Sequence, residues 1–284
     1  MRIFLTGGSG FTGFHFINYA FTLGHTIFNY QADILENNKL LIKELNEFQP
    51  EWIVNFAAIS HINYIDQSRI YDVNVIGTTN LLNAIIESNC KPNKVLLISS
   101  ANIYGNCGLK PISEKQEPSP LNHYAMSKLA MELMSKNYMD NMPIIIARPF
   151  NYTGIKQDNS FLIPKIIDKF KKRSDFITLG NIDIVREFND VNKICEIYFK
   201  LLELGVNGNT YNICSGISYT IQNILQMLRE LTRHDLNIII NNDYIRKNEL
   251  LFLVGNPTKL HSTIGEISHL PLIESLKTML FNNE

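Results

Sequence analysis

The stretch RIFLTGGSGFTG, residues 2–13, decides the fold of this chain of 284 residues. A β-prone run over Arg2–Thr6 leads into Gly7-x-x-Gly10-x-x-Gly13, and helix-like apolar spacing begins at Phe11. In such a turn the first glycine allows the sharp bend, the second lets a pyrophosphate approach, and the third lets helix and strand pack closely. The free N–H groups at the helix start can hold an anion. The stretch therefore predicts a dinucleotide-binding turn, although turns are also rich in glycine for steric reasons alone.

The same alternation of strand and helix continues along the chain. Apolar runs predict strands at 2–6, 26–30, 52–56, 94–99 and 144–147, with helices at 11–23, 35–48, 72–88 and 125–138. Because these runs are continuous rather than alternating, both faces of each strand are expected to be buried, as in a parallel sheet. We therefore predict an α/β fold, a Rossmann-type doubly wound parallel sheet with a smaller C-terminal lobe.

The rhythm changes after Pro149, where segments become shorter and richer in Asn and Gly. We predict a dinucleotide-binding domain over residues 1–150, to which residues 190–212 return. Residues 151–189 and 213–284 are predicted to form the smaller lobe, which would bind the substrate.

Composition narrows the class of protein. Hydrophobic residues make up 45% of the chain and charged residues 19%, and the net charge is −1. Such a balance gives no electrostatic support for binding nucleic acid or a membrane surface. The four cysteines lie far apart without a CxxC pair, which favours free thiols over disulfides or a metal site. No apolar run reaches membrane-spanning length and no signal peptide precedes the first strand, so we expect a cytoplasmic protein.

The residue at the end of the second strand should contact the adenosine ribose of the dinucleotide. An acidic residue there favours NAD and a nearby arginine favours NADP. The chain has Tyr30 at the position of the acid, and no arginine follows. The choice between NAD and NADP therefore stays open. Asp33 and Ile34 could cover the adenine, or Asp33 could cap the helix that begins near Leu35.

The sequence HYAMSK contains Tyr124 and Lys128, four residues apart at the start of a predicted helix. Side chains at this spacing share one helix face. A phenol of pKa about 10 is a poor acid or base at neutral pH, and a neighbouring ammonium should lower that pKa. Ser100 follows the fourth strand, at the edge of the sheet where ligands bind. The alternative is an exposed tyrosine and lysine with no shared role.

The motifs TGGSGFTG, NFAAIS, NVIGTTNLL, LISSANIYG, HYAMSK and ARPFNYTG resemble, in order and spacing, the extended short-chain dehydrogenase/reductases. The resemblance covers nearly the whole chain. It implies NAD or NADP in the first domain, a nucleotide sugar in the smaller lobe, and a catalytic triad of Ser100, Tyr124 and Lys128. It also implies a homodimer whose interface is built from the helices near 72–88 and 125–138 of each copy. The cofactor residues that it implies, besides Tyr124 and Lys128, are Gly7, Gly10, Phe11, Thr12, Gly13, Asp33, Ile34, Phe56, Ala57 and Ala58.

Within this family the chain is most similar to the GDP-4-keto-6-deoxy-D-mannose reductases, and next to the GDP-mannose 4,6-dehydratases. The segments ARPFNYTGIKQDNSFLIPK, LGNIDIVREFNDV and TYNICSG carry this likeness. Point charges and forked donors suit a diphosphate, and a carboxylate suits a ribose hydroxyl or a base N–H. A solvated surface charge is the alternative for each, above all for Lys165. The substrate-binding residues implied are Ser100, Asn151, Lys165, Arg186, Arg246 and Glu249.

Ala101 and Asn102 limit the reaction. A dehydratase must remove one proton and expel a hydroxyl, which needs an acid and a base beside the triad. Neither Ala101 nor Asn102 can act in that way. We therefore expect a carbonyl–alcohol interconversion at carbon 4 of a GDP-linked deoxyhexose or heptose, most simply a reduction. A 4-dehydrogenase or a 4-epimerase with tightly bound NAD, and a non-catalytic dinucleotide sensor, are the alternatives.

Overall fold

The computed structural model describes residues 1–61, 64–245 and 248–282. A six-stranded sheet in the order β10-β5-β4-β3-β1-β2 forms its centre, and every strand pair in it is parallel. The α/β prediction of a doubly wound parallel sheet is confirmed. The bounds of these strands are β1 Arg2–Thr6, β2 Thr26–Tyr30, β3 Trp52–Asn55, β4 Lys94–Ile98, β5 Ile144–Pro149 and β10 Thr210–Ile213.

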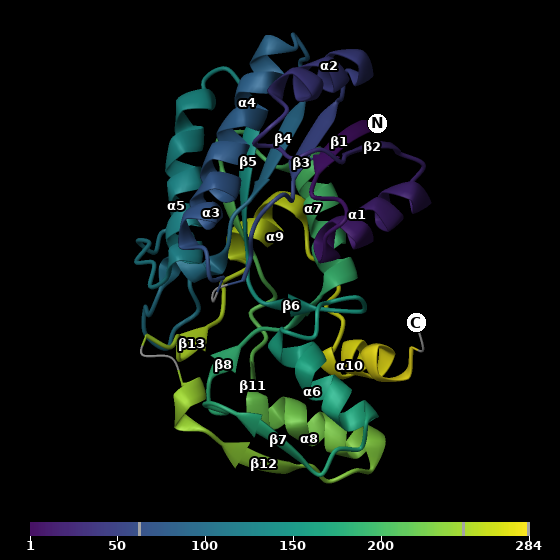
Figure 1. Cartoon of the computed structure of the whole chain (residues 1–284), viewed down its shortest axis with the longest axis vertical. Coiled ribbons are helices and arrows are strands. Elements are labelled where there is room, and N and C mark those ends of the chain that lie inside the picture. Colours follow the sequence, from purple (N-terminus) through teal and green to yellow (C-terminus); the bar gives the residue numbers. More distant parts are fainter. Residues whose placement is uncertain (62–63, 246–247, 283–284) are drawn as a thin grey trace.

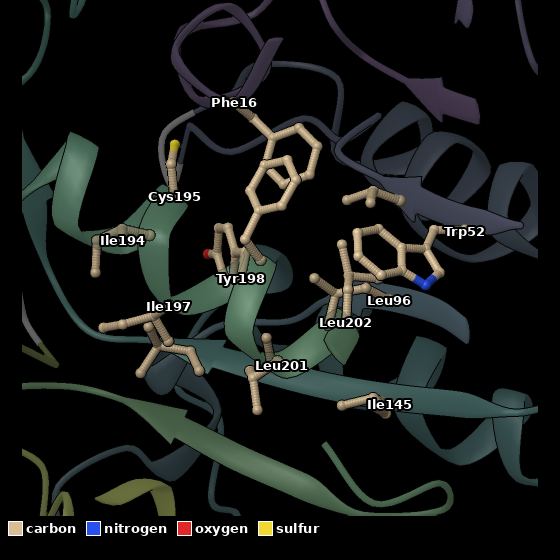
Figure 2. Close-up of a cluster of buried hydrophobic side chains, with 14 of the residues drawn as sticks. Phe16, Trp52, Leu96, Ile145, Ile194, Cys195, Ile197, Tyr198, Leu201 and Leu202 are labelled. Carbon is tan, nitrogen blue, oxygen red and sulfur yellow. The ribbon is translucent and has the colours of Figure 1, made fainter. Parts of the chain in front are cut away.

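Helices cover both faces of this sheet, which explains why its strands are apolar on both sides (Figure 1). One face packs against α1 (Phe11–Thr22) and α7 (Val191–Leu204), and Figure 2 shows the buried side chains of α7 gathered with Phe16 and Trp52. The other face packs against α2 (Asn38–Phe48), α4 (Thr78–Glu87) and α5 (His123–Ser135). We call the sheet and these helices the large lobe.

Three helix starts differ from the prediction, and one of them is α5, which begins at His123 rather than at residue 125. Helix α2 begins at Asn38 rather than near Leu35, because the Asn37 side chain caps it by accepting from the Leu40 N–H. The predicted helix over 72–88 begins with a π-helical turn, Asp72–Gly77, after a short α3 (Gln67–Tyr71), and continues as α4. The wider turn places Asn74 inside the protein, where its amide donates to Ser127 Oγ of α5 at 2.9 Å.

Most of the later elements form a small lobe below the sheet (Figure 1). Its core lies among α6 (Leu162–Lys171), α8 (Ile221–Thr232) and α10 (Leu272–Phe281). Its short strands pair as β6 with β9, β7 with β12, and β8 with both β11 and β13. Their bounds, with those of the 3₁₀ turns, are β6 Tyr152–Thr153, β7 Phe176–Leu179, β8 Val185–Arg186, β9 Asn189–Asp190, β11 Tyr219–Thr220, β12 Asn237–Ile240, β13 Phe252–Leu253, η2 Ala101–Tyr104, η3 Lys136–Tyr138 and η4 Asn242–Tyr244.

The chain passes between the lobes several times. As expected from residues 190–212, α7 packs on the sheet and β10 pairs with β5. The late helix α9 (Thr258–Ile264) also packs against α7 and β10, which the division at residue 213 did not anticipate. The residue boundaries of the two lobes stay a prediction. Over the described residues, no helix combines the length and apolarity that crossing a bilayer requires.

Glu187 joins several of these crossings. Its side chain is fully buried, and its carboxylate accepts from Gly255 N at 2.6 Å and from Ser215 N at 2.7 Å. Ser215 Oγ and the Asn189 amide also donate to it, at 3.2 and 3.0 Å. Burial raises the pKa of this carboxyl, and its hydrogen bonds oppose that rise. Glu187 therefore links the segments that follow β8, β10 and β13.

Candidate active site

The glycine turn after β1 has the close contacts that its sequence predicts. Gly7 has φ +71°, and a Cβ there would lie 2.5 Å from the backbone nitrogen of Ala57. A Cβ on Gly13 would lie 2.5 Å from the Gly7 carbonyl oxygen, so this glycine allows α1 to pack against the turn. Helix α1 has Gly10 as its N-cap and no side chain capping it. The first N–H groups of α1 are therefore available to an anion.

The strand end beside this turn differs from the expectation about Tyr30. Tyr30 is buried in the core, and its hydroxyl donates to the Asn37 carbonyl at 3.3 Å. Asn29 faces the turn instead, with its Oδ1 accepting from Gly8 N at 3.2 Å. The prediction missed Asn29, although the alternation of side chains along a strand separates these two neighbours. A neutral amide, not an acid, therefore lies at this point beside the glycine turn.

Asp33 caps no helix, since the N-cap of α2 is Asn37. Its carboxylate accepts from Leu35 N at 2.9 Å and pairs with Arg69 Nη2 at 2.9 Å, with both side chains partly exposed. Ile34 is buried, and its γ-methyl would meet a Cβ placed on Gly77. The roles of Asp33 and Ile34 beside an adenine stay predictions.

The three residues of the expected triad come together at the end of β4. Ser100 follows β4, and Tyr124 and Lys128 lie on the first two turns of α5, whose N-cap Asn122 accepts from Ala125 N. Lys128 Nζ donates to the carbonyl oxygen of Ile98 at 2.7 Å. The Ser100 side chain lies close enough to the Tyr124 phenol to lower its pKa. The strand end thus contacts both residues of the helix.

Burial controls the protonation of these groups. Ser100, Tyr124 and Lys128 are 4%, 9% and 5% exposed. Burial raises the pKa of Tyr124, and the neighbouring Ser100 side chain lowers it in part. Burial lowers the pKa of Lys128 to about 8, against the opposing effect of Glu132 one turn further along α5. The expected lowering of the Tyr124 pKa by the Lys128 ammonium is not found, because the loss of water around the phenol raises that pKa and only Ser100 opposes the rise.

A buried ion pair supports this helix from behind. Arg148 of β5 donates from Nε and Nη2 to both carboxylate oxygens of Glu132, at 2.9 and 2.6 Å. Its Nη1 donates to the hydroxyl of Tyr104 at 2.8 Å, and that hydroxyl donates to Asn212 of β10 at 2.7 Å. A bidentate pair of this kind has fixed geometry. It links α5 to β5 and, through Tyr104, to β10.

Tyr152 links the glycine turn to the catalytic side of the site, which the sequence did not suggest. Its hydroxyl lies 2.7 Å from Thr12 Oγ1, and its ring stacks on Phe11 with centroids 5.9 Å apart. Burial raises its pKa, and Tyr124 lies close enough to add to that rise. The expected cofactor residues Phe11 and Thr12 are thus both in contact with this one side chain. Phe56 packs on Phe16 of α1, and Ala57 and Ala58 follow it beside the turn.

Two of the expected substrate residues carry buried polar atoms with no hydrogen-bond partner in the described part of the chain. They are Asn151 Oδ1, directly after β5, and Glu249 Oε2, before β13. Such atoms are rare in folded proteins and call for an explanation. The backbone around Glu249 is held by Asn106, which donates to the Glu249 carbonyl at 3.0 Å and accepts from Leu251 N at 3.2 Å. Glu249 is therefore fixed beside the loop that follows the triad serine.

Two other expected substrate residues, Arg186 and Lys165, lie on different elements of the small lobe. Arg186 is buried and donates to the carbonyl oxygens of Val185 and Leu250, next to Glu249. Lys165 is half-buried on α6, with its ammonium 5.4 Å from the ring centroid of Tyr244. Arg246 lies outside the described residues. The structure therefore brings Arg186 to the segment of Glu249, while Lys165 approaches from α6.

Comparisons with known proteins agree with this geometry. The family model described as GDP-mannose 4,6 dehydratase matches residues 23–279. A GDP-6-deoxy-D-talose 4-dehydrogenase from Aggregatibacter actinomycetemcomitans is 34% identical, over 100% of this chain and 98% of that protein. A GDP-6-deoxy-D-mannose reductase from Pseudomonas aeruginosa is 31% identical, over 98% and 96%.

The solved structure of RMD from Pseudomonas aeruginosa, complexed with NADPH, superposes with a TM-score of 0.88 at 28% identity, covering 98% of this chain and 96% of that one. The family model covers most of the chain, and both relatives are matched over nearly their whole lengths. The chain therefore belongs to the GDP-mannose 4,6 dehydratase family, within the extended short-chain dehydrogenase/reductases.

Proposed function

We propose that this NAD(P)-dependent enzyme interconverts a ketone and an alcohol at carbon 4 of a GDP-linked deoxyhexose or heptose. Its main reaction would be the reduction of a GDP-4-keto-6-deoxy-mannose or of the corresponding heptose. One observation carries the proposal. Ser100, Tyr124 and Lys128 meet at the end of β4, while positions 101 and 102 beside them offer no acid or base.

The residues around the glycine turn fit a dinucleotide. A Cβ on Gly7 or Gly13 would fill the close approach between α1, β1 and the segment after β3, and no side chain caps α1. The N–H groups of α1 would hold the diphosphate. Lys128, by family resemblance, would donate to the hydroxyls of the nicotinamide ribose. When bound, the nicotinamide supplies or accepts the hydride.

Tyr124 would handle the proton at the sugar oxygen. In the reductive direction it protonates the oxygen on carbon 4, while Ser100 donates a hydrogen bond to the same oxygen. Burial raises the pKa of Tyr124, so the phenol holds its proton at neutral pH. A protonated donor is the form that a reduction needs. The raised pKa therefore supports reduction over oxidation as the easier direction near neutrality.

The nucleotide part of the substrate would lie toward the small lobe. Oε2 of Glu249, which has no partner among the described residues, would accept from a ribose hydroxyl or a guanine N–H, and Asn151 would contact the diphosphate or the sugar. Arg186 and Lys165 would supply positive charge to the diphosphate. Arg246, predicted for the same role, lies outside the described residues.

A second reaction has specific support. One relative, 34% identical over the whole chain, is named a GDP-6-deoxy-D-talose 4-dehydrogenase. The same triad can run in that oxidative direction, with Tyr124 as phenolate taking the proton from the hydroxyl on carbon 4. An epimerase would in addition have to keep its NAD bound between two hydride transfers.

We also propose a homodimer in a reducing cytoplasm. Exposed apolar side chains support the dimer: Met126 and Leu133, two turns apart on α5, are 45% and 53% exposed, and Ile76, just before α4, is 50% exposed. Such side chains are typical of a helix interface between two copies. All four cysteines are free, and most are buried, which supports a compartment that keeps thiols reduced.

The experiment that tests the proposed reaction uses purified protein with 4-keto sugars made from GDP-mannose, of six and seven carbons. Oxidation of NADH or NADPH is followed by absorbance, and the configuration of the product is determined. Loss of reduced cofactor with formation of a 4-hydroxy sugar is the expected outcome. NAD(H) that stays bound through purification, with carbon 4 inverted and no net redox change, would instead show an epimerase.

A further inference from the structure

Asn102 occupies the position where an acid would be needed for dehydration, and the structure shows what it does there instead. Ser100 is the N-cap of η2, so its Oγ accepts from Asn102 N at 3.2 Å. The side-chain amide of Asn102 donates to the same Oγ at 3.1 Å. A serine hydroxyl has two acceptor lone pairs and one proton to donate. Asn102 therefore occupies both lone pairs of Ser100.

Because both lone pairs of Ser100 Oγ are occupied, its O–H bond can point in only one direction. Both donors lie on the η2 side of the oxygen, so the O–H points away from η2. Ser100 also lies close enough to the Tyr124 phenol to lower the pKa of that phenol. Ser100 is 4% exposed, so water cannot easily substitute for either neighbour.

We infer that Asn102 is a positioning residue, which aims the Ser100 hydroxyl proton at the Tyr124 oxygen before the sugar binds and at the reacting sugar oxygen once it is bound. The inference rests on the proposed redox function of Tyr124. Asn102 takes no part in proton transfer itself. Its amide keeps Ser100 a donor toward the reacting oxygen, so that Ser100 stabilises negative charge on that oxygen.

The same geometry says what an acid at this position would do. A carboxylate has no proton to give at neutral pH and can only accept. The Ser100 proton would turn toward the carboxylate oxygens and away from Tyr124. An amide rotated by half a turn, with Oδ1 toward Ser100, would behave like that carboxylate. The two orientations of the Asn102 amide, with Nδ2 or with Oδ1 toward Ser100, therefore predict different effects of Asn102→Asp and Asn102→Ala.

The first experiment is a pair of substitutions in two backgrounds. Asn102→Ala should lower kcat several-fold when Ser100 is present, with KM for the sugar nearly unchanged. It should have no further effect in a Ser100→Ala background, because its action passes through Ser100. Affinity for the dinucleotide, measured on every variant, reports that the site is folded. Equal losses in the two backgrounds would overturn the inference and leave Asn102 a structural residue.

The second experiment needs no substrate. The ionisation of Tyr124 is followed through its phenolate absorbance, as the difference between each protein and the same protein carrying Tyr124→Phe. Asn102→Asp should move that titration to higher pH by about one unit, through lost Ser100 donation and added negative charge. Asn102→Ala should move it in the same direction by less. Asn93→Asp is the matched control, since Asn93 is exposed at the opposite end of β4 and should leave the titration unchanged.

A titration that Asn102→Ala leaves unchanged would sink the inference, since Ser100 would then need no help to donate. The two proposals fail separately. A wild-type protein that turns over no GDP sugar would refute the proposed function. The titration would still test Asn102.

Discussion

The end of β4 and the segment around Glu249 lie close together but differ in how completely the chain satisfies them. At the end of β4, Lys128 Nζ donates to Ile98, Ser100 Oγ accepts two hydrogen bonds from Asn102, and Arg148 holds Glu132 with two hydrogen bonds. Around Glu249, a buried carboxylate oxygen has no partner in the described residues, and Asn151 Oδ1 is in the same situation.

This contrast separates two kinds of site. Groups that must move protons are oriented beforehand, because a loose geometry would cost rate. Groups that must recognise a ligand carry unpaired acceptors, whose desolvation cost is recovered when the ligand supplies donors. The first kind should respond to mutation in turnover, and the second in affinity.

Tyr124→Phe should give the largest loss. Removing the group that protonates the reacting oxygen should lower kcat by at least about 100-fold, typical of general acid–base groups. Affinity for the dinucleotide should stay within a few-fold of wild type. Steady-state kinetics and cofactor fluorescence measure the two quantities. Tyr19→Phe, on the outer part of α1, is the control, and wild-type-like turnover by Tyr124→Phe would remove the triad assignment.

Glu249→Gln should act on affinity rather than on turnover. Losing a charged acceptor should raise KM for the GDP sugar by roughly 10- to 100-fold, the equivalent of a hydrogen bond to a charged group. The turnover number and the affinity for the dinucleotide should change little. If Glu249→Gln lowered only kcat, Glu249 would belong with the reacting groups. That result would contradict the division between the two kinds of site.

Glu187→Gln tests the buried junction where the segments that follow β8, β10 and β13 meet. Glutamine keeps the size of the side chain, but its NH₂ group would face N–H donors of Ser215, Gly255 or Asn189. Leaving such donors unpaired should lower the free energy of unfolding by roughly 1–3 kcal/mol. Denaturant unfolding followed by circular dichroism measures it. Glu266→Gln, at an exposed position, should leave the stability as it is in wild type.

The smallest effect should be a pH dependence of dinucleotide binding. The Lys128 pKa is lowered to about 8, so its ammonium is present below that pH and is lost above it. Affinity for NAD(P)H should therefore fall a few-fold as the pH rises through 8. Fluorescence titrations at several pH values measure it. Lys128→Met should bind weakly at every pH, and a midpoint that survives in this variant would assign the titration to another group.

Much of this site followed from local sequence patterns. The glycine turn, the strand runs and the Tyr124–Lys128 spacing each depend on a few neighbouring residues, so periodicity and turn chemistry sufficed to place them. The prediction for Tyr30 was wrong because neighbouring side chains of β2 face opposite sides of the sheet, so that Asn29 faces the glycine turn and Tyr30 the core.

Other features depend on residues far apart in the chain. The contact between Thr12 and Tyr152 joins positions that no local pattern connects. The bond network of Glu187 joins residues after three different strands, and only the folded topology brings them together. The effect of burial on Tyr124 also required the structure, because the sequence shows that an ammonium is near but not how much water is excluded.

The position of Gly255 has a consequence for how the protein is made. One oxygen of Glu187 is satisfied by the Gly255 N–H, which the ribosome adds only after nearly all of both lobes has been synthesised. Until then the emerging chain must leave that carboxylate in contact with water or protonated. The hydrogen bonds of Glu187 that join the lobes are therefore completed late in synthesis. A chain that stops short of Gly255 should be a good substrate for cellular proteases.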